Sequence, residues 1–358
     1  MLKIPGMILI VVESATKAKA ISEYLKGEKE KYVVFATYGH IRNLVTKSGS
    51  IETNADYKYH WKTTLQWEKH KKEILENAKK ADKIILATDL DREGEGIAWH
   101  LLEILKGNKI NKPTSRIVFH SVEKSAILDA LKHGQDLRVG LIESYLARIG
   151  LDYLFGFSIS PLLWHKIPCC KSAGRVQSVA LRLIVEREAE IKDFSSQKYL
   201  TVHAKFKEST QDSTMIEFDG QQFESGFIFK CPEKIALPDG AIDLKKFDGK
   251  FIVRDTKITQ SKQNAPAPFI TSTLLQAASS KLNFSPAMTM QLAQKLYEGF
   301  KIDGKHVGLI TYMRTDSVSI SKEATERLRQ FIGTNYGKKY LPKTPNKYKS
   351  KKSAQEAH

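Results

Sequence analysis

Short apolar stretches that alternate with amphipathic stretches along residues 7–131 are the feature that most constrains the fold. MILIVVES, YVVFATY, KIILATD and RIVFHSV are each rich in β-branched residues, as buried strands are. Helical patterns follow the first, third and fourth of them, and in GIAWHLLEIL the apolar side chains share one face. Strands that alternate with helices in this way form a parallel sheet covered by helices. We therefore predict an α/β domain at the N-terminus.

The rest of the chain changes its periodicity twice. Residues 141–197 are predicted to be helical, whereas residues 198–263 alternate apolar and polar residues with the period of two that strands have. The prolines of SKQNAPAP mark the end of this β-rich segment. Residues 264–358 are predicted to be mostly helical around an apolar strand that leads to Tyr312. We thus expect a multidomain protein with α/β, helical and β-rich parts, divided as 1–140, 141–197, 198–263 and 264–358.

The charge of the chain favours a polyanionic partner. There are 57 Lys and Arg residues against 40 Asp and Glu, which gives a net charge of +17. Residues 338–352 alone hold seven lysines and no acidic residue, a run that fits either a solvated surface or a surface that follows a phosphate backbone. No apolar stretch approaches the roughly 18 residues of a membrane-spanning helix, so no membrane is expected. Three cysteines without paired spacing favour a reducing, cytoplasmic environment.

The segment ATDLDREGEG holds the densest group of carboxylates. Asp89 and Asp91 follow a predicted buried strand, and Glu93 and Glu95 begin the next helix. Residues at the carboxyl end of a parallel strand face the crevice in which open α/β sheets bind ligands. Hard oxygen ligands of this kind suit Mg²⁺. The alternative is acidic residues that stabilise a helix N-terminus, which explains the two glutamates but not the two aspartates.

Two further groups of residues are candidates for chemistry. Glu13 ends the first strand, and Lys17 follows one helical turn later. They form either a proton-transfer or phosphate-binding pair near the aspartates or an ordinary surface ion pair. In KSAGRVQS, Gly174 and Arg175 stand at the start of a helix whose N-terminus suits an anion such as phosphate. A helix entered through a glycine, with no ligand, is the alternative there.

The stretch HVGLITYMRTDS brings Tyr312, Arg314 and Asp316 to the end of an apolar run. In an extended strand Tyr312 and Arg314 project from the same side. A free phenol has a pKa near ~10, so a nearby cation would favour its anion. A buried tyrosine followed by a surface ion pair is the alternative. GFKIDGKH fits a P-loop except that His306 replaces the Ser or Thr, and it follows a helix, so ATP is not expected.

Seven segments in order resemble the bacterial type IA DNA topoisomerase I family: VESATKAK, ATDLDREGEGIAWHL, SPLLWHKI, SAGRVQSVALRLIVEREAEI, PFITSTLLQAA, TMQLAQKLYEGF and GLITYMRTDS. The resemblance runs from near the N-terminus to the last residue. It implies that residues 1–140 have the Toprim fold, a Rossmann-like parallel sheet, with an inserted loop around residues 40–65 that belongs to the helical base at 141–197. Residues 198–263 would then form part of a β-rich arch, and residues 264–358 part of the domain with the catalytic tyrosine.

The same resemblance implies an isomerase that depends on Mg²⁺ but not on ATP and that relaxes negatively supercoiled DNA. Tyr312 would attack a phosphodiester of single-stranded DNA, leaving a 5′-phosphotyrosine and a free 3′-hydroxyl, and religation would follow strand passage. The resemblance implies that Tyr312 is assisted by Arg314, Asp316 and His358, and that protons at the leaving oxygen are transferred by Glu13 and Lys17. The implied Mg²⁺ ligands are Glu13, Asp89, Asp91 and Glu93. The implied DNA-binding residues are Arg175, Gln177, Ser172, Arg148 and His40. The resemblance also implies a monomer in the bacterial cytoplasm, associated with the nucleoid.

The chain departs from the family pattern at several positions. Ser121 stands where the family usually has a glutamate, GHIRNLV differs from the usual ending in Asp-Leu-Pro, and Ile149 and Tyr153 stand where arginines are often found. Because the family's chains continue beyond the motif histidine that His358 matches, the resemblance describes a C-terminally truncated member. Two alternatives follow: a relaxation-inactive fragment that binds single-stranded DNA, and a Toprim nuclease or primase. The motifs around Tyr312 argue against the second.

Overall fold

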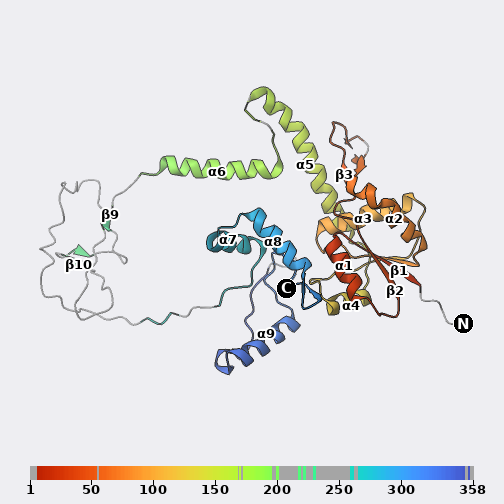
Figure 1. Ribbon diagram of the computed structural model, residues 1–358. Coiled ribbons are helices and arrows are strands. Elements are labelled where there is room, and N and C mark those ends of the chain that lie inside the picture. The colour runs from red at the N-terminus through yellow and green to blue at the C-terminus, as the bar shows by residue number, and fades with distance from the viewer. Residues whose placement is uncertain are drawn as a thin grey trace. The chain divides into compact units, whose positions relative to one another are not determined.

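The computed structural model describes residues 6–54, 56–167, 169–170, 172–195, 259–261, 265–350 and 354, and the backbone of four short strands (Figure 1). These strands are β9 (Tyr199–Leu200), β10 (Glu217–Phe218), β11 (Gln221–Gln222) and β12 (Phe229–Lys230), paired antiparallel as β9 with β12 and β10 with β11. The chain divides into two compact units, residues 1–175 with 264–358 and residues 176–263. Most of the β-rich segment predicted at residues 198–263 lies outside the described residues, as does His358.

A four-stranded parallel sheet forms the centre of the N-terminal part, with the strand order β2-β1-β7-β8 (Figure 1). Its strands are β1 (Met7–Val12), β2 (Lys31–Ala36), β7 (Lys83–Leu86) and β8 (Thr114–Arg116). The helices of this part are α1 (Ala15–Tyr24), α2 (Leu65–Lys80), α3 (Arg92–Gly107) and α4 (Lys124–Lys132). The α/β domain predicted from the alternating pattern is thus confirmed.

Each face of this sheet has its own hydrophobic core, because successive side chains of a strand point to opposite faces. Ile10 of β1 belongs to the core that α1 and α4 complete, and Leu9 belongs to the core that α2 and α3 complete. The first core also includes Tyr297 and Tyr312, which come from the last part of the chain. Burial of apolar surface therefore attaches the segment with Tyr312 directly to the sheet domain.

An insert between β2 and α2 forms two antiparallel strand pairs. β3 (Arg42–Leu44) pairs with β6 (Trp61–Thr63), and β4 (Ile51–Glu52) pairs with β5 (Lys58–Tyr59). The insert contacts the long helix α5 (Val139–Lys166), since Tyr59 Oη donates to Leu146 O (2.9 Å) and Tyr153 Oη donates to Lys47 O (2.6 Å). A second long helix, α6 (Arg175–Asp193), follows α5 in the sequence.

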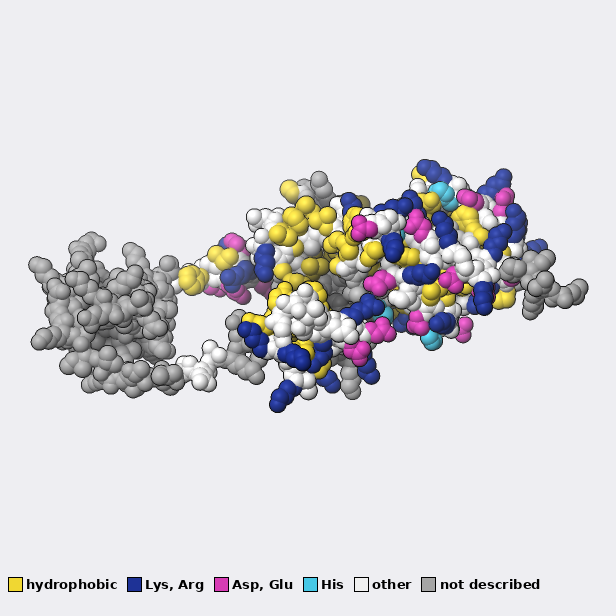
Figure 2. Space-filling model, turned by 60° about the horizontal axis from the view of Figure 1, so that its bottom comes forward, with side chains coloured by type: hydrophobic (Ala, Val, Ile, Leu, Met, Phe, Trp, Pro, Cys, Tyr) yellow, Lys and Arg dark blue, Asp and Glu magenta, His cyan; other side chains and the backbone are white. Residues whose placement is uncertain are grey.

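The surface of the described part carries many basic and many apolar side chains. Figure 2 shows lysines and arginines over much of the face that it presents, together with yellow apolar areas. By length and composition, α5 is the one helix among the residues described that could cross a membrane, with a mean hydropathy of 1.2 over 18 residues. The sequence analysis did not find it because charged residues interrupt its apolar run. Core helices of soluble proteins meet the same criterion, so the helix alone is weak evidence for a membrane.

The C-terminal part consists of helices and one hairpin. Its elements are α7 (Thr271–Leu282), α8 (Pro286–Glu298), β13 (Phe300–Ile302), β14 (Lys305–Val307), α9 (Lys322–Asn335) and the 3₁₀ helix η2 (Lys338–Tyr340). Gly299 ends α8, and the Ser321 hydroxyl caps α9. Asp303 and Gly304 form the turn of the hairpin with φ angles of 49° and 77°, so GFKIDGKH is a hairpin turn and not a phosphate-binding loop.

Two predicted strands are wrong in position. The fourth strand of the sheet was expected across RIVFHSV, but β8 ends at Arg116. The strand expected to lead to Tyr312 ends at Val307. The two segments that follow these strands contact each other instead, and Tyr312 N donates to His120 O (2.9 Å). Phe119 and Met313 are buried where these segments lie together, so this part of the apolar pattern indicated burial rather than pairing within a sheet.

Candidate functional site

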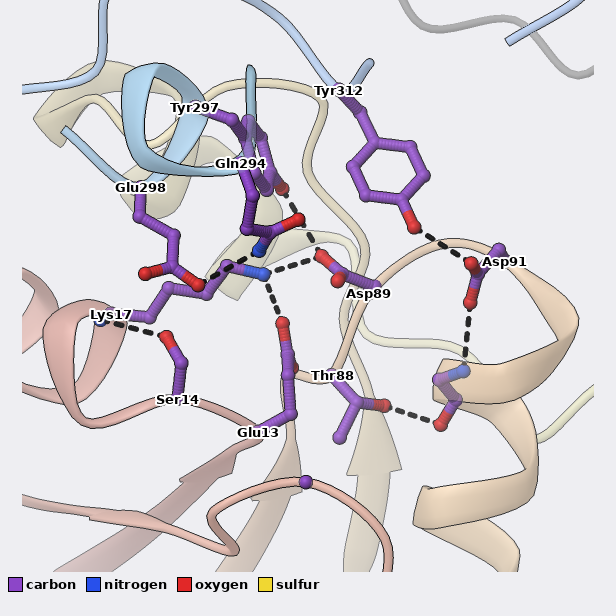
Figure 3. Close-up of polar contacts among 12 residues, drawn as sticks. Glu13, Ser14, Lys17, Thr88, Asp89, Asp91, Gln294, Tyr297, Glu298 and Tyr312 are labelled. Carbon is purple, nitrogen blue, oxygen red and sulfur yellow. Dashed lines mark hydrogen bonds and ion pairs between the residues drawn. The ribbon is translucent and has the colours of Figure 1, made fainter. Parts of the chain in front are cut away.

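The candidate site lies at the carboxyl ends of β1 and β7, the two central strands of the sheet (Figure 3). Glu13 follows β1 and Asp89 follows β7, so the parallel strands bring these residues to the same edge. The Ser14 hydroxyl caps α1 by accepting from Lys17 N (3.2 Å). Asp91 Oδ1 caps α3 by accepting from Gly94 N (2.8 Å). The two caps fix where the first turns of α1 and α3 begin.

The start of α3 lies very close to the turn after β7. A Cβ atom at Gly94 would lie 2.1 Å from Asp89 O, a distance that no side chain can occupy. The Thr88 hydroxyl donates to Gly94 O (2.6 Å), which holds the same two segments together. Gly94, the first glycine of DREGEG, is therefore needed for the close approach of the helix to the strand end.

Lys17 is completely buried between two carboxylates. Its ammonium group forms ion pairs with both Glu13 and Asp89 (Figure 3). Burial acts to lower the pKa of Lys17, but the charges of Glu13 and Asp89 together outweigh it and raise the pKa. Burial, followed by the charge of Glu13, raises the pKa of Asp89 to about 7. Glu13 and Lys17 are therefore not the ordinary surface pair that the sequence left open.

Tyr312 is 1% exposed, and its phenol faces Asp91 (Figure 3). Its Oη donates to Asp91 Oδ2 (2.7 Å), and Arg314 Nη1 lies 3.3 Å from the same oxygen. Burial raises the pKa of Tyr312 far above its ordinary value, and the charges of Asp89 and Asp91 raise it further. Arg314 acts in the opposite direction, as expected, but it is outweighed. The resting phenol is therefore protonated.

A second buried tyrosine, Tyr297, lies beside the first. Its ring centre is 5.2 Å from that of Tyr312 in an edge-on arrangement, and its Oη lies 3.4 Å from Asp89 Oδ1. Burial, followed by the charge of Asp89, raises the pKa of Tyr297 well above its ordinary value. Tyr297 was not among the site residues predicted from the sequence. The available signal was its place with Thr289 and Ala293 on one face of α8, at a spacing of four.

Arg116 was also missed, although it stands as a charge within the apolar run RIVFHSV. Its side chain is fully buried, and its Nε donates to Glu95 Oε2 (3.1 Å). Its Nη1 donates to Thr88 O (2.8 Å) and its Nη2 donates to Asp89 O. Glu95 also accepts from Arg138 N (2.7 Å). The guanidinium group thus holds the turn that carries Asp89.

The predicted metal ligands lie near one another but do not form a completed metal site. In the part of the chain that the structure describes, no group of three or more His, Cys, Asp and Glu side chains is arranged to hold a metal ion. Asp89 pairs with Lys17, and Asp91 accepts from Tyr312. Glu13 Oε2 is buried without a hydrogen-bond partner among the described residues. An unpaired buried carboxylate oxygen is costly, and a cation would satisfy it.

Two cavities meet at the phenol's acceptor. The first has a volume of about 400 Å³ and is lined by residues that include the four predicted ligands Glu13, Asp89, Asp91 and Glu93, with His40, Gln291, Gln294 and Arg314. The second has a volume of about 620 Å³, and its lining includes Arg92, Ser144, Arg148, Ile270, Thr271, Ser272 and Asp316. Asp91, Glu93 and Arg314 line both cavities. Asp91, which accepts from the Tyr312 hydroxyl, is thus reached from both cavities.

The residues expected to bind DNA fall into two sets. His40 Nε2 lies 3.9 Å from Glu93 Oε2, and Arg148 Nη1 lies 3.1 Å from Glu93 Oε1, so both are at the cavities. The others are not among the residues that line them: Arg175 pairs with Asp152 (2.9 Å) at the start of α6, and Ser172 and Gln177 flank it in the sequence.

A parallel sheet with acidic residues after its central strands is typical of the Toprim domain, and residues 8–122 match that domain. Residues 136–358 match the family described as DNA topoisomerase. The two matches cover most of the chain, which therefore belongs to the bacterial type IA DNA topoisomerase family. The family and the fold class predicted from the sequence are confirmed.

Individual relatives agree with this assignment. DNA topoisomerase 1 of Rickettsia felis is 44% identical over 98% of this chain and 45% of its own length. DNA topoisomerase 1 of Xylella fastidiosa strain 9a5c is 44% identical over 98% of this chain and 43% of its own length. The structure of full-length topoisomerase I from Thermotoga maritima is similar with a TM-score of 0.75 and 35% identity, over 93% of this chain and 53% of that one. The chain thus spans about half the length of these relatives.

Proposed function

We propose that this chain carries out the DNA-cleaving step of a type IA topoisomerase. The observation that carries the proposal is the 2.7 Å hydrogen bond from the buried Tyr312 phenol to Asp91, beside Arg314 and the carboxylates after β1 and β7. Tyr312 Oη attacks a phosphodiester of single-stranded DNA. One O–P bond forms, the bond from phosphorus to the 3′-oxygen breaks, and the products are a 5′-phosphotyrosine and a 3′-hydroxyl.

Two proton transfers accompany this exchange. Because the pKa of Tyr312 is raised, its proton leaves as the new O–P bond forms rather than beforehand. Asp91, which already accepts from the phenol, takes that proton. Lys17, protonated between Glu13 and Asp89, gives a proton to the departing 3′-oxygen. The guanidinium group of Arg314, which lines both cavities, balances the negative charge on the phosphate oxygens.

The bound metal in this proposal is Mg²⁺. The residues fit it, because Glu13 Oε2 is buried with no hydrogen-bond partner in the part of the chain that the structure describes, and Asp89, Asp91 and Glu93 present oxygen donors to the same cavity. When bound, the ion neutralises phosphate charge at the cleavage site. These acidic residues alone would repel a phosphate, so the proposal requires the charge of a cation in addition to Lys17 and Arg314.

The reaction is reversible without ATP in this proposal. The phosphotyrosine bond retains the free energy of the phosphodiester that was broken, so the 3′-hydroxyl restores the DNA strand by attacking the same phosphorus. Passage of a second strand before religation relaxes negatively supercoiled DNA. We place this activity in a monomer that acts in the bacterial cytoplasm on the nucleoid.

The proposal is tested with a single-stranded oligonucleotide labelled on the 3′ side of the break. The 358-residue chain is incubated with it and Mg²⁺, quenched with denaturant and separated on a denaturing gel. Label bound to the protein is expected for the native chain and absent for Tyr312→Phe. The matched control is Tyr336→Phe, an exposed tyrosine of the same part of the chain, which keeps the label.

Binding is measured on the same variants so that loss of cleavage is not confused with loss of folding. Tyr312→Phe is expected to bind the oligonucleotide about as well as the native chain, because the exposed cation Arg314 remains. A labelled adduct that persists in Tyr312→Phe would overturn the assignment of the nucleophile. No adduct with the native chain, despite binding, would overturn the proposal that this chain cleaves DNA.

A further inference from the structure

The lysine-rich run at residues 338–352 has no role in the reaction described above. The structure describes this run as far as Ser350, and that part contains five lysines. They are Lys338, Lys339, Lys343, Lys347 and Lys349, all exposed. None of the five forms an ion pair with a carboxylate among the residues described. Their charges are therefore available to an anion from outside.

The part of this run from Pro342 onward is held at three points along its length. Arg329 Nη1 donates to Pro342 O (3.0 Å). Tyr348 Oη donates to Ala265 O (3.2 Å). Ser350 Oγ accepts from Val318 N (3.0 Å), and it lies 3.3 Å from the hydroxyl of the buried Ser317. A lysine run that only solvates a surface needs no such attachments.

The attachment points lead to the second cavity. Ser317 directly follows Asp316, which lines that cavity. Ala265 is five residues before Ile270, which lines the cavity from the start of α7. The two sides are joined to each other, because Thr271 N donates to Thr315 O (3.0 Å). The lysine run is thus anchored to both segments that form this wall of the cavity.

An aromatic side chain lies within the same run. Tyr340 is exposed, and the ammonium of Lys339 lies 5.0 Å from the centre of its ring. Basic side chains that alternate with an exposed ring are the combination with which proteins bind single-stranded nucleic acid, since cations contact phosphates and rings stack on bases. A duplex would offer its phosphates but not its bases to such a surface.

We infer that residues 338–349 form a binding surface for the backbone of single-stranded DNA that continues from the second cavity. The inference rests on the proposed function and adds the place where the strand leaves the cleavage site. The five lysines contact phosphates, and Tyr340 stacks on a base. Binding at this surface positions the strand but does not take part in the bond exchange at Tyr312.

The salt dependence of binding tests this inference. The probe is a fluorescent oligothymidylate of 30 nucleotides, bound to the 358-residue chain at several NaCl concentrations. Each phosphate contact contributes about 0.7 to the slope of log K against log salt for a single strand. Replacing all five lysines with glutamine is therefore expected to reduce this slope by about 3.5. Replacing them with arginine is expected to leave it unchanged.

The control removes the same net charge from the opposite edge of the sheet. Lys26, Lys29, Lys79, Lys80 and Lys109 are exposed and lie beyond the C-termini of α1, α2 and α3 or in their last turns. In a parallel α/β unit these helix ends lie away from the strand ends that carry the site. Replacing these five with glutamine is expected to change the slope by less than 1, the contribution of about one contact.

Adduct formation at saturating DNA separates this inference from the proposed function. The five-lysine variant is expected to reach the native level of Tyr312 adduct once its weaker binding is saturated. An unchanged slope in that variant, or an equal loss in the control variant, overturns the inference while leaving the cleavage proposal intact. A reduced slope without any adduct in the native chain supports the binding surface and overturns the proposed function.

Discussion

The buried guanidinium of Arg116 predicts a large loss of stability on substitution. In Arg116→Met the apolar replacement fills much of the same volume, so the main effect is the loss of polar contacts. Glu95 then stays buried without its charge partner, and breaking a buried pair in this way costs about 3–5 kcal/mol. The carbonyls of Thr88 and Asp89 lose a donor as well, each worth about 1 kcal/mol or more.

Some acceptors of the Arg116 guanidinium keep another donor after the substitution, and this limits the expected loss of unfolding free energy. Arg116 Nη1 also donates to Leu86 O (3.1 Å), but this carbonyl keeps a partner because it accepts from Ile117 N as well (2.9 Å). Glu95 keeps the backbone donor of Arg138. We therefore expect the free energy of unfolding to fall by about 3–5 kcal/mol in Arg116→Met, a large fraction of the roughly 5–15 kcal/mol of a typical domain.

Equilibrium unfolding in urea, followed by far-ultraviolet circular dichroism, measures this loss. The double variant Arg116→Met/Glu95→Gln removes the unpaired charge and is expected to recover part of it. Lys106→Met is the matched control, because its ion pair with Glu103 on the same helix is exposed and worth less than about 1 kcal/mol. A loss below about 1 kcal/mol in Arg116→Met, or no recovery in the double variant, would refute this reasoning.

Two further predictions concern the same sheet domain. Gly94→Ala is expected to lose several kcal/mol, about 3 or more, because the added Cβ would lie 2.1 Å from Asp89 O. Gly107→Ala, in open space on the same helix, is expected to gain about 0.5–1 kcal/mol, and thermal unfolding of both variants checks the contrast. Burial, followed by the charge of Arg42, lowers the pKa of His100 to about 3. Below about pH 6.5 the unfolded chain takes up a proton that the folded chain does not bind until about pH 3, so stability falls as the pH falls, by up to about 1.4 kcal/mol per unit. Urea midpoints at pH 7, 6 and 5 should show a shallower decline in His100→Asn, and equal slopes in both proteins would contradict the assignment.

Local patterns predicted the framework of the site but not its closest contacts. β1 and β7 end where their apolar runs end, and their parallel order alone brings Glu13 to Asp89. The hydrogen bond from Tyr312 to Asp91 joins residues 221 positions apart, and no spacing in the sequence reports it. The same long-range packing explains the error at Tyr312, which is buried against another segment rather than paired in a sheet.

Burial itself was the harder property to predict. Lys17 has the spacing of a surface pair with Glu13, and only the fold shows that its ammonium is enclosed. Arg116 was missed for the same reason, since a single charge has no periodicity of its own, whereas the spacing of four that includes Tyr297 indicates burial but not a place beside Tyr312. The sequence therefore indicated which residue types meet at the strand ends, whereas the protonation of Tyr312 depends on how tightly they are packed.

The burial of Tyr312 has a consequence for affinity. Its side chain is 1% exposed, whereas the side chain of Arg314 is 56% exposed, so an incoming phosphate meets the arginine before the phenol. In the proposed reaction the phenol must be uncovered before it can reach a phosphate, and in the conformer described it is buried. The apparent dissociation constant for cleavable DNA therefore equals the intrinsic constant divided by the fraction of molecules in the open conformer. A substitution that loosens the contact between Tyr312 and the sheet domain would thus tighten DNA binding while it lowers the stability of the free protein.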